Sequence, residues 1–144
     1  MSQLIFVNLP VRDLQHSTAF YEAIGAKKNP QFSGATASCM VFSETIHVML
    51  LTHEKFSQFT PRRIANAKET TEVLICISAD SREGVDSITE KALGAGGAEP
   101  RDRQDYGFMY SRAFEDPDGH IWEPMWMDVE AACAAMAGEA TADA

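Results

Sequence analysis

Short apolar runs separated by polar turns divide the chain into elements that recur in the same order twice. The first set predicts a strand over 5–9 and a helix that Asp13 caps and Gly25 ends. Two further strands are predicted over 35–42 and 46–51. A polar stretch with Pro61 in its middle follows, and we interpret it as a connector with at most one helical turn.

The second set repeats this pattern. It predicts a strand over 72–78, a helix that Asp80 or Ser81 caps and Gly94 ends, and strands over 108–114 and 121–127. The two helix ends match, because Glu-Ala-Ile-Gly-Ala at 22–26 corresponds to Lys-Ala-Leu-Gly-Ala at 91–95. The chain is therefore predicted to be two copies of a β-α-β-β-β unit.

These elements predict one domain over residues 1–127. It contains unit 1 over 1–51, a connector over 52–70 and unit 2 over 71–127. Residues 128–144 are rich in alanine, and we expect this tail to begin as a helix and to be partly disordered.

Asp116-Pro117-Asp118-Gly119 is a turn signal, because Pro presets φ, Asp bonds its own backbone and Gly accepts positive φ. Apolar and aromatic runs flank it, so we expect the turn to join two antiparallel strands. Glu123 then lies within the second strand, between Trp122 and Pro124. A carboxylate among such neighbours needs either solvent or a partner, since burying it unpaired is costly.

Composition narrows the possible partners. The hydrophobic fraction of 45% fits a globular domain, and the net charge of −9 excludes nucleic acid and anionic membranes as expected partners. We see neither a signal peptide nor an apolar run long enough to span a membrane. The three cysteines are widely spaced and odd in number, which favours reduced thiols and a cytoplasmic location.

The paired units, closed by Phe-Glu-Asp-Pro-Asp-Gly-His-Ile-Trp-Glu at 114–123, resemble the vicinal oxygen chelate superfamily. That superfamily includes glyoxalase I, extradiol dioxygenases, fosfomycin resistance enzymes and bleomycin resistance proteins. The opening runs at 6–14 and 20–25 look like the first unit of its glyoxalase-like members. The resemblance implies an α+β fold in which two tandem βαβββ units form a curved, partly open mixed sheet around a cavity. It also implies a homodimer.

The resemblance further implies four metal-ligand positions that point inward, two in each unit. In this sequence they fall on Phe6, Met49, Glu72 and Glu123. Two carboxylates without imidazole suit zinc or iron poorly, but they could hold Mg²⁺ or Mn²⁺, or share a proton. Any cofactor is therefore expected to be a divalent metal (Mg, Mn, Ni or Zn), with Glu123 and Glu72 as the candidate catalytic residues.

Strand alternation extends this site, because every second residue shares a face. Asn8 shares the face of Phe6, His47 that of Met49, and Cys76 that of Glu72. Glu123 is accordingly predicted to face Glu72 across the cavity, with a possible three-ligand metal set completed by His47. The predicted ligand-binding wall is Phe6, Asn8, His47, Met49 and Cys76.

Three functions remain open. The preferred one is a small-molecule-binding protein with a degenerate metal site, as in the bleomycin-binding members. The alternatives are a metal-dependent lyase or dioxygenase, and a partner or sensor module without chemistry of its own. Lactoylglutathione lyase activity is expected to be absent or negligible, because Phe6 and Met49 cannot coordinate the metal that polarises the substrate. Arg62 and Arg63 are interpreted as solvated.

Overall fold

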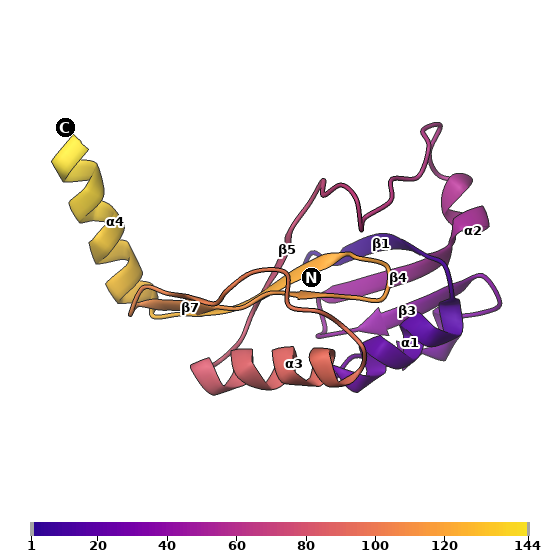
Figure 1. Cartoon of the computed structure of the whole chain (residues 1–144), viewed down its shortest axis with the longest axis horizontal. Coiled ribbons are helices and arrows are strands. Elements are labelled where there is room, and N and C mark those ends of the chain that lie inside the picture. The colour runs from indigo at the N-terminus through magenta and orange to yellow at the C-terminus, as the bar shows by residue number, and fades with distance from the viewer. Residues whose placement is uncertain (1, 144) are drawn as a thin grey trace.

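The computed structural model describes residues 2–143, with side chains through residue 138, and shows an α+β fold (Figure 1). In unit 1, β1 is an edge strand that pairs in parallel with β4, and the sheet order is β1-β4-β3-β2. The elements of unit 1 are β1 (Ile5–Val11), α1 (Leu14–Ala23), β2 (Lys27–Asn29), the short 3₁₀ helix η1 (Pro30–Phe32), β3 (Ala37–Val41) and β4 (Ile46–Thr52).

Unit 2 repeats this topology. Its edge strand β5 pairs in parallel with β9, the order is β5-β9-β7-β6, and β8 also pairs with β9. The elements of unit 2 are β5 (Ile75–Ser78), α3 (Arg82–Gly94), β6 (Gln104–Asp105), β7 (Met109–Ser111), β8 (Phe114–Glu115) and β9 (Ile121–Met127). The connector carries α2 (His53–Ser57), and α4 (Val129–Asp143) follows β9. The predicted class and the repeat are confirmed.

Two sequence predictions in unit 2 are wrong. The strand does not begin at Glu72: β5 begins at Ile75, where the ladder with β9 starts opposite Trp122. The strand predicted over 108–114 is divided into β7 and β8, which are separated at Arg112 and Ala113. The predicted end of the helix at Gly94 is confirmed, and the positive φ of 98° falls on Gly96. The predicted partial disorder of the tail stays a prediction, and Ala144 lies outside the described residues.

Helices α1 and α3 lie on the same side of the two sheets (Figure 1). Side chains of α1, α3 and the strands above them form one apolar core that joins the two units. The opposite side of the sheets carries the connector with its short helix α2, which lies against β1 and β4, and we call this side the uncovered face. The buried members of the core are Leu9, Val11, Phe20, Tyr21, Ile24, Ala26, Met40, Val48, Leu50, Ala92, Phe114 and Trp122.

A buried hydrogen-bond network joins α1 of unit 1 to the turn between β8 and β9. The Tyr21 hydroxyl donates to Asp116 Oδ2 at 2.6 Å and accepts from Trp122 Nε1 at 3.0 Å. Burial raises the pKa of Asp116, and the charge of His120 and the Tyr21 hydrogen bond act in the opposite direction. Burial and the Asp116 carboxylate raise the pKa of Tyr21 well above 10.0. The hydroxyl therefore stays protonated and remains a donor.

A second network secures α3 beneath unit 2. The Arg112 side chain is 3% exposed, so its guanidinium needs counter-charges, and Asp86, Glu90 and Glu99 all lie within 3.0 Å of it. Its hydrogen bonds to Arg112 hold the pKa of Glu99 below the usual value. The ion pairs of Arg112 with Asp86 and Glu90 hold α3 to the sheet.

We predict that Tyr21→Phe lowers the free energy of unfolding by about 1–3 kcal/mol, the cost of leaving buried polar groups without a partner. Asp116 Oδ2 and Trp122 Nε1 would both lose their bond to the hydroxyl. Urea denaturation measures the change. Tyr106→Phe is the matched control, because Tyr106 is 60% exposed. Equal stability of the two variants would contradict this role for Tyr21.

Candidate functional site

On unit 1, four of the predicted site residues lie side by side on the uncovered face. In the β1–β4 register Phe6 lies opposite His47 and Asn8 opposite Met49. The rings of Phe6 and His47 stack with centroids 4.5 Å apart and planes 18° apart. Among the described residues, His47 Nδ1 is the one buried side-chain polar atom without a hydrogen-bond partner. The stacked pair thus offers a ligand an apolar aromatic surface, mainly through the exposed Phe6 ring, while His47 Nδ1 is buried.

On unit 2, Glu123 lies on the uncovered face next to Cys76, its partner in the β5–β9 register. Trp122 and Pro124, on either side of it, are buried toward the helices. The Glu123 side chain is 22% exposed and accepts a charged hydrogen bond at 3.0 Å from Arg101 Nη2. The same nitrogen donates to Ser111 Oγ at 3.2 Å. Glu123 therefore has a protein cation as its partner.

This charge pair also affects the neighbouring thiol. Burial and the Glu123 carboxylate raise the pKa of Cys76, and the Arg101 charge opposes them. The thiol is therefore protonated at neutral pH and is a poor nucleophile and metal ligand. Cys76 is suited to contact a ligand as a small apolar group with a weak donor.

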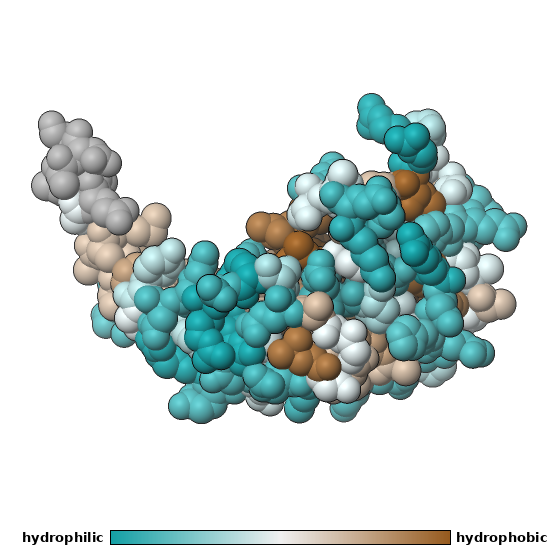
Figure 2. Space-filling model, viewed as in Figure 1, coloured by the Kyte–Doolittle hydropathy of each residue, from teal (hydrophilic) through white to brown (hydrophobic). Residues whose placement is uncertain are grey.

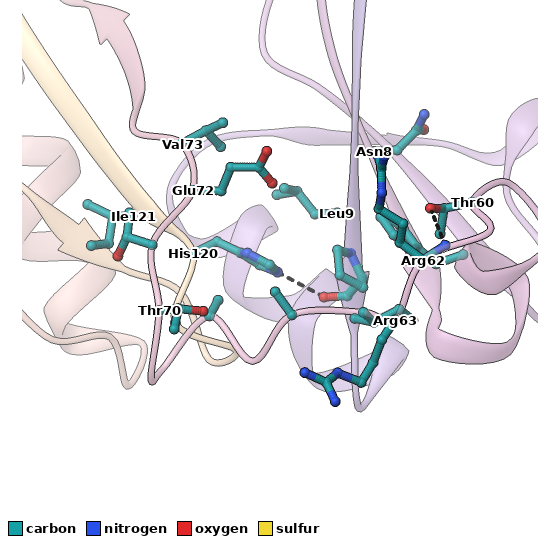
Figure 3. Close-up of a pocket in the computed structure, with 17 residues that line it drawn as sticks. Asn8, Leu9, Thr60, Arg62, Arg63, Thr70, Glu72, Val73, His120 and Ile121 are labelled. Atoms are coloured by element: carbon teal, nitrogen blue, oxygen red, sulfur yellow. Dashed lines mark hydrogen bonds between the residues drawn. The ribbon is translucent and has the colours of Figure 1, made fainter.

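Glu72 lies in a different place from the one predicted. It belongs to the connector, before β5 begins, and it lines a pocket of about 370 Å³. Figure 3 shows this pocket between the connector, the β1 segment at Asn8 and Leu9, and the start of β9 at Ile121. Of the predicted residues, Asn8 and Glu72 line it. Since Asn8 shares a face with Phe6, the pocket opens onto the uncovered face.

The donors present do not fit a metal ion. In the part of the chain that the structure describes, no three His, Cys, Asp or Glu side chains come together as a metal site requires. The predicted set of His47, Glu72 and Glu123 is therefore not assembled. The guanidinium of Arg101 lies 3.0 Å from the Glu123 carboxylate.

Gly119 lets the connector pass close to the turn between β8 and β9, where the connector covers the pocket. A Cβ at this position would lie 2.8 Å from the backbone nitrogen of Lys68 and 2.9 Å from the carbonyl carbon of Ala67. Such distances are shorter than real Cβ contacts, so the connector passes this close only because residue 119 has no side chain. The φ of Gly119 is also positive, at 94°. The turn predicted from sequence thus positions the part of the connector that covers the pocket.

The sequence analysis missed Arg101 and Ser111. Arg101 precedes β6 in a stretch with several other charged residues, and no local pattern distinguishes it from a solvated arginine. Alternation along β9 and β7 is a usable signal for Ser111, because it lies opposite Met125, two residues from Glu123 and on the same face.

Comparisons with known proteins identify the family. The family model of the Glyoxalase/Bleomycin resistance protein/Dioxygenase superfamily matches residues 3–123. The chain therefore belongs to this superfamily. None of the curated proteins compared with the sequence matches it.

Solved structures share the fold. The hypothetical protein SA1046 from S. aureus is 29% identical, with a TM-score of 0.72 over 88% of this chain and 95% of that one. A glyoxalase/bleomycin resistance protein/dioxygenase family enzyme from Burkholderia phytofirmans is 18% identical, with a TM-score of 0.71 over 88% and 99%. The fosfomycin resistance protein FosX from Mesorhizobium loti is 17% identical, with a TM-score of 0.67 over 92% and 98%.

Among the described helices, none has the length and apolar character to cross a membrane.

We predict that Gly119→Ala displaces the connector and destabilises the protein more than Gly107→Ala does. Both glycines have positive φ, but a Cβ on Gly107 would meet nothing within 4 Å. The difference between the two variants therefore isolates the contact with the connector. Urea denaturation gives the stability, and amide hydrogen exchange of residues 66–70 reports the displacement. Equal effects of the two substitutions would show that the connector does not depend on Gly119.

Proposed function

We propose that this protein binds a small organic molecule on its uncovered face and does so without a metal ion. The observation that carries the proposal is the ion pair of Glu123 with Arg101 at 3.0 Å, which neutralises the carboxylate at the family's expected metal position. The pocket of about 370 Å³ supports it, because ligand pockets range from about 300 to 1,000 Å³. The Phe6–His47 surface supplies apolar contact on the same face.

A metal-dependent lyase or dioxygenase is the second candidate, favoured by superfamily membership alone. Such chemistry needs an ion held by several protein donors with an open position for substrate. In the described residues those donors are apart, and the carboxylate best placed to take part is paired with Arg101. A fold shared with enzymes does not transfer their chemistry.

We predict that protein purified without chelator contains far less than one metal ion per chain. Titration of the apo protein with Mn²⁺, Ni²⁺ and Zn²⁺, followed by calorimetry, should give no stoichiometric binding, because Arg101 already neutralises Glu123. Arg101→Gln frees the carboxylate and should give weak binding at most. One tightly bound ion per chain that Glu123→Gln removes would overturn the metal-free proposal.

We also propose that the protein is a homodimer. The edge strands β1 and β5 end their sheets, and apolar side chains near them are exposed: Leu4 by 49%, Ile5 by 54% and Leu74 by 55%. Figure 2 shows apolar surface beside β5, on the side away from α3. A second copy of the chain that covers these residues would also help to enclose the uncovered face.

Sedimentation equilibrium at micromolar concentration should therefore give twice the mass of the chain. Leu74→Lys should shift the protein toward monomer, because it places a charge in the exposed apolar segment. Phe59→Lys is the control, since Phe59 is also exposed, by 67%, but belongs to the connector. A wild-type protein that stays monomeric at high micromolar concentration would contradict the dimer.

A further inference from the structure

The pocket under the connector carries charges of both signs that the protein itself does not use. Glu72 and Arg62 both line it and lie on opposite sides of it (Figure 3). In the described part of the chain, neither side chain takes part in any of the five ion pairs or in a side-chain hydrogen bond. In unit 2, by contrast, Arg82 and Arg112 are bound to carboxylates.

Between these two charges the pocket wall combines apolar side chains with polar ones such as Thr70 and His120. Leu9 and Ile121 form its floor on the strands, and Val73 lies beside Glu72 (Figure 3). A ligand that fills the pocket displaces the water that now solvates Glu72 and Arg62. Both side chains are exposed, so the ligand removes only part of their water, and an opposite charge on the ligand offsets that partial loss.

We infer that the pocket binds a small zwitterion, with its ammonium group at Glu72, its acid group at Arg62 and an apolar chain between them. The inference rests on the proposed small-molecule-binding function and names its ligand class. A simple anion would leave the Glu72 carboxylate without an opposite charge, and a simple cation would leave the Arg62 guanidinium without one. A zwitterion has no net charge, so the net charge of −9 on the chain does not repel it.

The test compares probes of equal chain length that differ only at their ends. These are 6-aminohexanoate, hexanoate, hexylamine and hexan-1-ol, with 4-aminobutanoate as a shorter zwitterion. Binding is measured by NMR shifts of the Asn8 and Thr71 amides, two pocket positions. A zwitterion should bind about fivefold more tightly than either singly charged probe, which corresponds to the one further, partly solvated ion pair that it makes.

Three variants test which side chain binds the ammonium group of the ligand and which binds its acid group. Glu72→Gln should lower the affinity for 6-aminohexanoate to that of hexanoate, and Arg62→Gln should lower it to that of hexylamine. Arg63→Gln is the matched control and should change neither, because Arg63 also lines the pocket but its guanidinium points away from Glu72 (Figure 3). The substituted side chains are exposed, so the fold should survive each change.

The outcomes separate this inference from the proposed function. If hexan-1-ol or hexanoate binds at these amides as tightly as the zwitterions, the small-molecule site stands and the zwitterion inference is wrong. If no probe of either length shifts the pocket amides, the inference fails and the pocket loses its support as the ligand site. Loss of binding in Arg63→Gln equal to that in Arg62→Gln would also overturn the assignment of the acid end.

Discussion

The Asp116 carboxylate is where the two units are bound together. Its Oδ2 accepts from Tyr21 of α1, while Oδ1 accepts from the backbone N–H groups of Asp118 and His120 within its own turn. One buried side chain thus fixes the turn and docks it against unit 1. Because a buried carboxylate without these donors would be strongly destabilising, the relative placement of the two sheets depends on this residue.

The pocket on the uncovered face depends on the way Asp116 docks the turn against unit 1. Once the turn is docked, the Asp118 carboxylate accepts from the Arg12 backbone N–H and the Ser17 hydroxyl, and Gly119 admits the connector. The connector then closes a pocket over Asn8 and Ile121, which come from different units. The site between the sheets is therefore a consequence of inter-unit hydrogen bonds, and changes in the turn are expected to reach it without touching a ligand.

Local patterns in the sequence were sufficient for the repeat, the α1 cap at Asp13 and the bounds of β9, because each depends on neighbouring residues. Alternation also placed Phe6 and His47 on one face, since the pleat has a strict period. The start of β5 was not predictable in this way. Val73 and Leu74 are as apolar as strand residues, but the ladder with β9 begins only at Ile75.

The chemistry at Glu123 was the least predictable feature, because its partner Arg101 lies 22 residues away in an irregular segment. The resemblance to the superfamily could not reveal it either. Three residues that carry most of that resemblance have structural roles in this chain. Asp116 binds Tyr21, Gly119 lets the connector pass close to the turn, and Trp122 fills the core. Within the motif, Glu123 alone lies at an expected metal-ligand position. A motif composed mainly of such structural residues identifies the fold, and the neighbours of Glu123 decide whether a metal can bind there.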